Sequence, residues 1–341
     1  MIKEIKKLSI CIPTYNRSYH LNNCLNSIIQ NGKICKDIDI CISDNNSSDN
    51  TIEIIKPYKK ILNIKYKKNS ANIGVAKNIL SSVEISNSEF CWIIGDDDLL
   101  LDNALEVVLK LIKIHKNKDF FYINSFHLRS SVLKNYNHPI KTTNLPKTLK
   151  KFSNYNEDIE GKFKKLINTN ICFDFFGGSY LSVFRKKNWD INLDKIDYQK
   201  LDNKLLFSNL DNTFPHTKIF SYAFIESDSY FYSRPLTINL HGEREWKDLY
   251  PIVRTFRTSE LLESYYNNGI DLITYIKNKN SNLKYFIPDI IKIVCNLKNT
   301  YYYIPNLFVF FLKNFYYPNI YLSIFYQISK TLKKLLNEKK M

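Results

Sequence analysis

The sequence predicts an α/β fold, with a mainly parallel, Rossmann-like sheet flanked by helices and a helical region at the C-terminal end. Two observations carry this prediction. Short apolar runs alternate with segments of helical periodicity through about residue 125, which is typical of a parallel, doubly wound sheet. After about residue 246 the strand pattern stops and aromatic residues become frequent. We therefore expect a sheet domain over residues 1–246 and a helical region over residues 247–341.

Five apolar runs are expected to be strands of this sheet. They are Leu8–Ile12, Ile38–Ser43, Ile64–Tyr66, Phe90–Ile94 and Phe120–Ile123. Between them, apolar residues recur at helical spacing from Leu21, Ile52, Val75 and Ala104 onward. The most apolar runs lack the alternation of a half-exposed strand, so we expect them to be buried on both faces of the sheet.

The composition is basic and rich in apolar residues. Lysine and arginine number 49 against 33 aspartates and glutamates, which gives a formal net charge of +16. Such a charge indicates an anionic partner, and an anionic membrane leaflet is one candidate. Nucleic acid is not expected, because the sequence contains no zinc-finger spacing, helix-turn-helix signal or RNP-type motif.

Cysteine usage and the N-terminal residues indicate a reducing compartment. The seven cysteines form no CxxC pair, and Cys11, Cys41 and Cys91 fall within expected buried strands. The first residues, Met1–Lys7, contain no apolar segment of the kind found in signal peptides. We therefore expect a cytoplasmic protein, either free or peripheral on the inner face of the cytoplasmic membrane.

Three consecutive carboxylates follow the fourth expected strand. The run that begins at Phe90 leads through Gly95 into Asp96, Asp97 and Asp98. Adjacent carboxylates repel one another, so a compensating cation is expected, and hard oxygen ligands suit Mg²⁺ or Mn²⁺. The alternative is an acidic turn that caps the following helix.

Polar loops follow three of the expected strands, at residues 14–17, 44–49 and 96–98. The carboxyl ends of parallel strands meet at one edge of a sheet, which is where such folds bind ligands. Asp44 is placed there to accept hydrogen bonds from a base or a ribose hydroxyl, or else to cap its own turn. Neither a GxGxxG fingerprint nor a P-loop is present, so phosphates would depend on the metal.

Four sequence blocks occur in an order and spacing that resemble a known family. They are Cys11–Arg17, Ile42–Thr51, Asn72–Asn78 and Gly95–Asp98. Together they resemble the family-2 glycosyltransferases of the GT-A fold. The Gly95–Asp98 block, with Phe176–Ser179 and Phe214–His216, is similar to the bacterial abequosyltransferase-like branch. The resemblance is strong over about residues 8–125 and fades to fragments by about residue 245.

This resemblance implies a site for a nucleotide-sugar donor and a Mn²⁺ or Mg²⁺ ion. Thr14, Asn16 and Asp44 would hold the base and ribose. Lys77 would lie near the diphosphate. The further donor-site residues that it implies are Pro13, Tyr15, Arg17, Asn46, Asn72, Gly74, Asp96 and Asp97. The metal motif would be Asp96, Asp97 and Asp98, although many relatives carry a carboxylate where Gly95 stands.

Further along the chain, the resemblance implies an acceptor site and a general base. Gly177, Gly178 and Ser179 would border the acceptor, although adjacent glycines also suit a simple bulge. Two residues compete as the base, Asp211 and His216. We favour His216, because an imidazole with an ordinary pKa of roughly 6.5 accepts protons at neutral pH, whereas an aspartate would need a raised pKa. The alternative for His216 is a core histidine.

A polar cluster after the last strand-like run holds three more candidates. His241 is either a third metal ligand, as in some GT-A enzymes, or a structural residue. Arg244 and Trp246 would clamp an acceptor phosphate or sugar, unless Arg244 forms an ordinary surface salt bridge.

Two segments stand outside the motif pattern. Residues 126–165 are rich in lysine, asparagine and serine and are expected to form an insertion or lid. Residues 247–275 are expected to form a helix, and aromatic residues crowd the chain from Ile287 onward beside lysines. Lys313 and Pro318 interrupt any run long enough to span a bilayer. The C-terminal region therefore suits either a helix on an anionic membrane surface or a helical domain packed on the core.

Together, the residues and the resemblance predict a metal-assisted, inverting glycosyltransferase. It would move a sugar from a nucleotide-sugar donor to a hydroxyl of a lipid-linked surface-glycan intermediate, such as an O-antigen or capsule precursor. A sugar-phosphate nucleotidyltransferase is the rival enzyme class, but it would need a Gly-rich basic loop after the first strand, and Pro13–Arg17 contains no glycine. The non-enzymatic alternative is a basic membrane-surface binding protein, which the net charge alone does not exclude.

Overall fold

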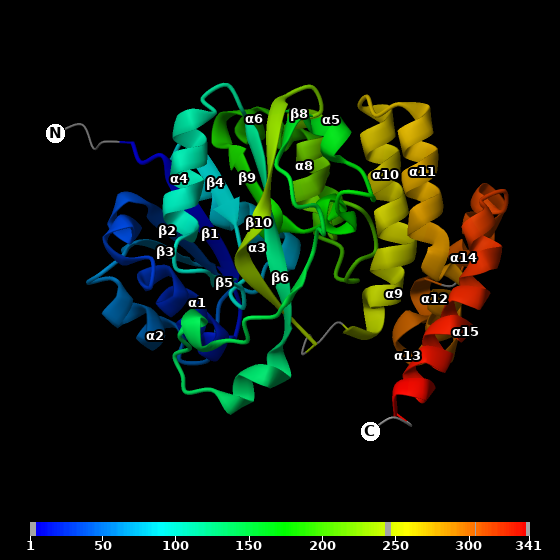
Figure 1. Ribbon diagram of the computed structural model, residues 1–341, viewed down its shortest axis with the longest axis horizontal. Coiled ribbons are helices and arrows are strands. Elements are labelled where there is room, and N and C mark those ends of the chain that lie inside the picture. The colour runs from blue at the N-terminus through cyan, green and yellow to red at the C-terminus, as the bar shows by residue number, and fades with distance from the viewer. Residues whose placement is uncertain (1–4, 243–246, 304, 339–341) are drawn as a thin grey trace.

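One mixed sheet forms the centre of the described part of the chain (Figure 1). The computed structural model describes residues 5–242, 247–303 and 305–338. The strand order is β3-β2-β1-β4-β9-β6-β10-β5, with β7 paired to β6 and β8 paired to β10. The strands are β1 Leu8–Thr14, β2 Asp39–Asp44, β3 Asn63–Lys68, β4 Phe90–Ile93, β5 Leu99–Leu100, β6 Phe120–Arg129, β7 Lys150–Lys151, β8 Ile159–Lys162, β9 Ser182–Arg185 and β10 Asp228–His241.

The first four strands are parallel, as the sequence predicts. β1 pairs with both β2 and β4, and β2 pairs with β3. In β1, Ile10 and Ile12 enter one apolar cluster of the core, and Cys11 enters the other. Successive side chains of a strand point to opposite faces, so β1 is buried on both sides. Each buried isoleucine contributes about 1.5–3 kcal/mol to stability by leaving water.

The other half of the sheet mixes strand directions. β9 lies antiparallel between β4 and β6, and β6 runs parallel to the long strand β10. β10 shifts its register on β6 between Tyr232 and Thr237, and its residues from Thr237 pair with β5. Because β5 follows Asp98 directly, the last residues of β10 lie next to the acidic turn.

Helices cover both faces of the sheet. α1, α2 and α4 pack into one apolar cluster, and α3 and α8 pack into the other. The helices of this part are α1 Ser18–Ile29, α2 Thr51–Tyr58, α3 Val75–Glu84, α4 Ala104–Ile114, α5 Phe163–Leu166, α6 Lys186–Ile191, α7 Tyr198–Leu201 and α8 Pro215–Ala223. The predicted α/β class, with helices on both sides of the sheet, is therefore confirmed.

The predicted insertion begins later than the sequence indicates, because β6 continues to Arg129. Two short 3₁₀ turns and the strands β7 and β8 follow it. The segment packs on α1, where Asn26 and Gln30 donate side-chain hydrogen bonds to the Ile140 carbonyl at 2.8 and 3.0 Å. It is an integral part of the sheet domain, and a lid motion stays a prediction.

The C-terminal helices stack beside the sheet domain (Figure 1). They are α9 Tyr250–Ile252, α10 Thr258–Asn267, α11 Leu272–Asn282, α12 Phe286–Cys295, α13 Leu297–Thr300, α14 Pro305–Asn314 and α15 Pro318–Glu338. Tyr303 donates a hydrogen bond to the Leu206 carbonyl, and Asn278 donates one to the Ile167 carbonyl at 2.9 Å. These bonds attach the helices to two separate loops of the sheet domain.

The prediction of one helix over residues 247–275 is wrong. Three α-helices, a 3₁₀ turn and a π-helical stretch share this range, and α10 ends at Asn267. Two residues later, Gly269 takes a φ of 126°, a left-handed conformation that an α-helix cannot continue. In the described ranges, none of the helices has the length and hydropathy of a bilayer span. The domain division at residues 246 and 247 stays a prediction.

Candidate active site at the carboxyl edge of the sheet

Three loops meet where β1, β2 and β4 end. The backbone N–H of Asn45 donates to the Thr14 carbonyl at 2.9 Å, which joins the loops after β1 and β2. The Thr14 hydroxyl donates to Oδ2 of Asp96 at 2.8 Å, which joins the loops after β1 and β4. The predicted convergence of the three polar loops is therefore confirmed.

The acidic turn after β4 carries an internal counter-charge. Arg17 places Nη2 2.8 Å from Oδ2 of Asp97 and Nη1 3.2 Å from Oδ1 of Asp96. Burial lowers the pKa of Arg17, but the negative charges of Asp96 and Asp97 outweigh burial, so the pKa lies above its ordinary value. Arg17 thus supplies the positive charge that adjacent carboxylates require.

Asp98 accepts hydrogen bonds through both of its carboxylate oxygens. Oδ2 accepts from the Gly95 N–H at 2.6 Å, and Oδ1 accepts from the Asn239 side chain at 2.7 Å. Asp98 therefore ties the acidic turn to β10. A Cβ atom on Gly95 would lie 2.7 Å from Oδ1 of Asp97. A side chain at residue 95 would therefore require the Asp97 carboxylate to shift.

Asp96 and Asp97 have the chemistry of a divalent-cation site. Mg²⁺ and Mn²⁺ prefer carboxylate oxygens together with phosphate oxygens of a substrate. Across residues 5–242, 247–303 and 305–338, no three Asp, Glu, His or Cys side chains converge as ready metal ligands. Asp96 and Asp97 supply carboxylate oxygens of the type that suits Mn²⁺ or Mg²⁺, and both are paired with Arg17 in the structure.

Asp44 is buried at the end of β2, and both of its oxygens have partners. Oδ1 accepts from the Ser47 N–H at 2.8 Å, and Oδ2 accepts from the Tyr66 hydroxyl at 2.6 Å. Burial, and then Asp44, raise the pKa of Tyr66 above its ordinary value. Asp44 therefore caps its own turn in this state, and its role toward a nucleoside stays a prediction.

Asn16 and Asn46 lie in the first two loops, and Asn16 joins these loops to each other. Both take the left-handed backbone conformation, with φ of 51° and 66°. The Asn16 N–H donates to the Ser47 hydroxyl at 2.9 Å, and the Asn16 side-chain oxygen accepts from the Ser48 N–H at 2.8 Å. Tyr15, which precedes Asn16, is exposed beside these contacts. Pro13 lies within β1 itself.

Asn72, Gly74 and Lys77 lie together at the start of α3. Oδ1 of Asn72 accepts from the Asn45 side chain at 2.7 Å and from the Gly74 N–H at 3.0 Å. Gly74 takes a φ of 84°, which a residue with a side chain rarely adopts. Lys77 forms an ion pair with Asp202. Lys77, the residue expected near the diphosphate, is therefore paired with Asp202 in this structure.

Asn78 ends the Asn72–Asn78 block of the family resemblance, but the sequence analysis assigned it no role. Its side chain is buried, donates to the Thr14 carbonyl at 3.2 Å and accepts from the Ser43 hydroxyl at 2.7 Å. It joins the ends of β1 and β2 to α3. The sequence offered one signal, its place directly after Lys77, but helical spacing alone does not show that the side chain turns inward.

His216 lies buried in the first turn of α8. Nε2 donates to the Gly177 carbonyl at 3.0 Å, and Nδ1 has no partner among the described residues. Burial lowers the pKa of His216 to about 4, although the bond to Gly177 opposes this effect. The expectation of an ordinary imidazole pKa is therefore wrong. The ring is neutral at pH 7 and keeps a lone pair on Nδ1.

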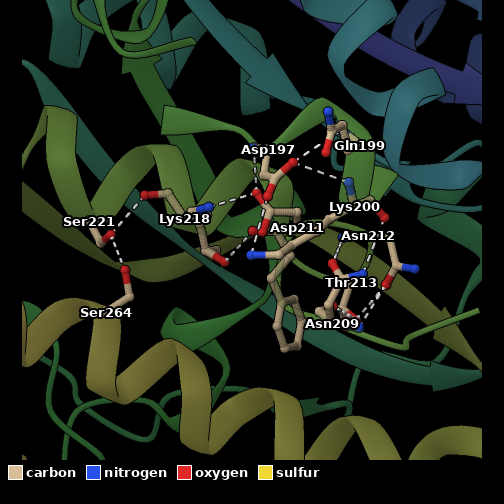
Figure 2. Close-up of polar contacts among 12 residues, drawn as sticks. Asp197, Gln199, Lys200, Asn209, Asp211, Asn212, Thr213, Lys218, Ser221 and Ser264 are labelled. Carbon is tan, nitrogen blue, oxygen red and sulfur yellow. Dashed lines mark hydrogen bonds and ion pairs between the residues drawn. The ribbon is translucent and has the colours of Figure 1, made fainter. Parts of the chain in front are cut away.

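Asp211 is held in an ion pair with Lys218 (Figure 2). Its Oδ1 lies 2.6 Å from Nζ of Lys218 and also accepts from the Asp197 N–H at 2.9 Å. Asp197 in turn caps α7 with its side chain. Asp211 therefore organises residues 197–218, and a role as general base would require its release from Lys218.

The turn at Gly177 and Gly178 is shaped by packing. A Cβ atom on Gly177 would lie 2.7 Å from the Phe214 ring, and one on Gly178 would lie 2.9 Å from the Asp174 carbonyl. The segment around the two glycines forms two short 3₁₀ turns, Phe173–Phe176 and Ser179–Leu181, which lead into β9. The expected acceptor role of Gly177, Gly178 and Ser179 stays a prediction.

Asp174 is a titratable group beside this turn that the sequence analysis also missed. Its carbonyl accepts from the N–H groups of Gly177 and Gly178 at 3.2 and 2.7 Å. Burial raises the pKa of its carboxyl group to about 6, and hydrogen bonding and the charges of Lys150 and Lys284 only partly oppose this. Asp174 therefore bonds to this turn through its backbone, whereas His216 bonds to it through its side chain.

His241 ends β10 on the same face as Asn239, because alternate residues of a strand share a face. Since Asn239 bonds to Asp98, His241 lies two residues beyond the point where β10 meets the acidic turn. Its exposed ring meets that of His127 edge-on at 6.0 Å between ring centres. Burial, and then His241, lower the pKa of His127 to about 4. Two expected acceptor residues, Arg244 and Trp246, lie outside the described residues.

A comparison with models of protein families identifies the family of this chain. The model described as glycosyl transferase family 2 matches residues 9–186. The chain belongs to glycosyltransferase family 2. The family-2 match contains all three converging loops and the Gly177–Gly178 turn, and it confirms that the protein is a glycosyltransferase.

Individual relatives extend the family-2 likeness. The abequosyltransferase RfbV of Salmonella typhimurium is 29% identical over 281 residues, which are 80% of this chain and 79% of RfbV. TarS 1–349 of S. aureus, solved with UDP, has a TM-score of 0.56 at 17% identity over 82% of this chain and 71% of its own. The mannosyltransferase PcManGT of Pyrobaculum calidifontis, solved with GDP-Man and Mn²⁺, has a TM-score of 0.51 at 11% identity over 98% of this chain and 88% of its own. The expected GT-A fold and the abequosyltransferase-like branch are confirmed.

Proposed function

We propose that this family-2 glycosyltransferase moves a sugar from a nucleotide-sugar donor to a hydroxyl group of a surface-glycan intermediate, with inversion at the anomeric carbon. One observation carries the proposal. Asp96 and Asp97 stand at the end of β4 and are bound there by Thr14 and Arg17 from the end of β1. Two carboxylates that could bind a metal ion together with a diphosphate thus lie beside loops that suit a nucleoside.

The donor would lie along the loops after β1 and β2. Thr14, Asn16 and Asp44 would bind the base and ribose, with Asp44 exchanging the Tyr66 hydroxyl for a donor group. Lys77 would leave Asp202 for the diphosphate. The rest of the donor wall would be Pro13, Tyr15, Asn46, Asn72 and Gly74. The nucleotides bound to TarS and PcManGT support a nucleotide-sugar donor for this chain.

Asp96 and Asp97 would hold Mn²⁺ or Mg²⁺, with His241 as a further ligand. When bound, such an ion stabilises the negative charge that develops on a departing diphosphate. The Mn²⁺ in the PcManGT complex supports a metal in this fold. Arg17, released from the two carboxylates, would then be available to a donor phosphate, and Asp98 would keep the turn bound to β10.

The acceptor would lie at the Gly177–Gly178 turn, with His216 as the general base. The hydrogen bond from Nε2 to Gly177 fixes the tautomer and leaves the lone pair on Nδ1, which would accept the hydroxyl proton. Because Nδ1 is buried, the surrounding segment would have to open to admit the acceptor. Asp174 is the alternative base at the same turn. Inversion would follow if the deprotonated hydroxyl attacks the anomeric carbon from the side opposite the diphosphate, so that the new C–O bond forms as the bond to the diphosphate breaks.

A lipid-linked glycan is the acceptor that we propose, with Ser179, Arg244 and Trp246 as its contacts. The likeness to RfbV, an abequosyltransferase, supports transfer to a polysaccharide precursor. Such an acceptor would place the reaction at the cytoplasmic surface of a membrane.

A panel of nucleotide-sugars tests this function. Each is incubated with the full-length protein, Mn²⁺ and a lipid extract that carries glycan precursors, and products are resolved by mass spectrometry. We expect one donor to yield a nucleoside diphosphate and a glycosylated lipid, with both lost in Asp97→Asn. Formation of a nucleoside triphosphate and a sugar phosphate from donor and pyrophosphate, without transfer, would identify a nucleotidyltransferase instead.

A further inference from the structure

The two last helices expose apolar side chains in a regular pattern. On α14, Phe308 and Leu312 are followed by Phe315 just beyond the helix, at spacings of four and three residues. On α15, Tyr321, Phe325 and Ile328 repeat the same spacings. Residues at these intervals share one face of a helix, so each helix presents an exposed apolar stripe. We call these six residues the aromatic face.

The aromatic face is additional to the surface that these helices use for packing. Phe310 of α14 stacks on Phe286, with 5.8 Å between ring centres, and is directed into the C-terminal core. Ile320 and Ser323 of α15 are buried on the inner side of that helix. A surface helix of a soluble protein places polar residues opposite its buried stripe. On α14 and α15 the outer side is apolar as well, which marks an interaction surface.

The charge around the aromatic face is positive. Residues 286–341 contain eight lysines and no arginine, against two acids, Asp289 and Glu338. Asp289 is buried and ion-paired with Arg254, so its charge does not reach the surface. Lys292, Lys298 and Lys313 are exposed. An apolar surface with basic surroundings is complementary to an anionic lipid leaflet, whereas a second copy of the chain would bring like charges together.

We propose that the aromatic face is a docking surface for an anionic lipid leaflet. A turn at Phe315–Tyr317 separates α14 from α15, which begins at Pro318. Helices with an exposed apolar stripe can lie in the plane of a membrane interface with that stripe towards the lipid. Tyrosine rings are favoured at the depth of lipid headgroups, and phenylalanine and leucine form the apolar side of helices that lie at a membrane interface. In Figure 1, α14 and α15 form the end of the molecule that lies farthest from β1, β2 and β3, and they present a free outer side.

Docking on this face would also position the acceptor side of the enzyme. Tyr303, between α13 and α14, donates a hydrogen bond to the Leu206 carbonyl, and Leu205 packs against the same cluster. Residues 205 and 206 belong to the segment that leads to Asp211 and His216. The lipid-binding inference stands on the surface alone; that the leaflet also carries the acceptor rests on the proposed function.

Vesicle flotation of the full-length protein tests the docking surface. The probes are vesicles of phosphatidylcholine alone and of phosphatidylcholine mixed with phosphatidylglycerol, at low and high salt. We expect binding to the mixed vesicles at low salt, weaker binding at high salt, and little binding to phosphatidylcholine alone. Protein that stays unbound to anionic vesicles at low salt would overturn the proposal.

A double variant, Phe308→Ser with Phe325→Ser, tests the face itself. Its two side chains are 68% and 66% exposed, so their replacement should leave the fold intact while reducing the vesicle partition coefficient by about tenfold or more. Ile191→Ser on α6 is the matched control, because Ile191 is 66% exposed but lies in the sheet domain. Equal binding of the double variant and the wild type would overturn the assignment.

Two further measurements separate the outcomes. The variant Lys292→Glu with Lys313→Glu leaves the apolar stripes intact. It should weaken binding to the anionic vesicles but not to vesicles of phosphatidylcholine. Unchanged binding to the anionic vesicles would contradict the role of charge. Sedimentation velocity tests the other occupant: a dimer in the wild type that the double variant abolishes would assign the face to a second copy. Binding of nucleoside diphosphate should be unchanged in all these variants, so a failed donor site and a failed lipid surface give different results.

Discussion

Arg17 lies against Asp97, with Nη2 2.8 Å from Oδ2, and it reaches Asp96 through Nη1. The arginine side chain is 32% exposed, whereas both carboxylates are almost fully buried. Two buried like charges need a nearby cation. Arg17 supplies that positive charge in the structure. The metal ion that we propose at the acidic turn would take the place of this partly exposed arginine.

Arg17→Ala should tighten Mn²⁺ binding by about tenfold, because it removes the positive charge that competes for Asp96 and Asp97. Calorimetric titration of the nucleotide-free protein measures this change. Arg17→Lys is the matched control, since it keeps the charge and should alter the affinity less. Unchanged or weaker Mn²⁺ binding by Arg17→Ala would show that the guanidinium does not compete with a metal.

Asp98→Asn should lower the free energy of unfolding by about 1–3 kcal/mol, because an amide cannot accept hydrogen bonds from both Gly95 and Asn239. Asp97→Asn should lower it by less than about 1 kcal/mol, since Asp97 faces the partly exposed Arg17. Urea unfolding followed by circular dichroism gives both values. If both variants lost the same free energy of unfolding, the idea that Asp98 is structural while Asp97 binds a metal would be contradicted.

Lys77→Ala should weaken binding of nucleoside diphosphate by about tenfold or more, the usual range for a lost charge-assisted hydrogen bond. Asp202→Ala removes the partner that holds Lys77 in the structure and should leave the affinity unchanged or higher. Fluorescence titration with the preferred nucleotide compares the two variants. A similar loss in both would mean that the ion pair itself, and not a free Lys77, supports binding.

The pH dependence of kcat/KM distinguishes His216 from Asp174. A general base works in its deprotonated form, so activity is present above its pKa and is lost as the pH falls through that pKa. With His216 as the base, whose pKa is about 4, the profile should stay flat from about pH 8 to about pH 5. A fall that begins near pH 6 would point to Asp174. His216→Ala should lower kcat by about 10²–10⁴-fold with donor binding retained.

Local sequence patterns were enough to predict most helices and strands, and also the edge of the sheet where the three polar loops meet. The apolar run from Leu8 ends near Pro13, and the helical periodicity around Ala104–Ile114 matches α4 residue for residue. Parallel strand order then implies that the loops after β1, β2 and β4 meet. The same reasoning failed at Gly269, because apolar spacing continues across a residue whose backbone ends the helix.

Local sequence patterns could not predict contacts between residues that lie far apart in the chain. Arg17 and Asp97 are 80 residues apart, and Asn239 bonds to Asp98 across 141 residues. Neither pairing leaves a trace in spacing or composition. The altered pKa of His216 likewise depends on how deeply α8 is buried, which only the folded chain determines.

Binding of nucleoside diphosphates with and without Mn²⁺ is the most direct test of a metal-assisted donor site at Asp97. UDP, GDP, CDP, ADP and dTDP are titrated into the wild type and into Asp97→Asn, with Mn²⁺ or with EDTA. We predict that one of them binds the wild type, and that either EDTA or Asp97→Asn weakens this binding by about tenfold or more while the unfolding midpoint is unchanged. Binding of none of the five, or binding that neither change affects, would contradict a metal-assisted donor site at the acidic turn.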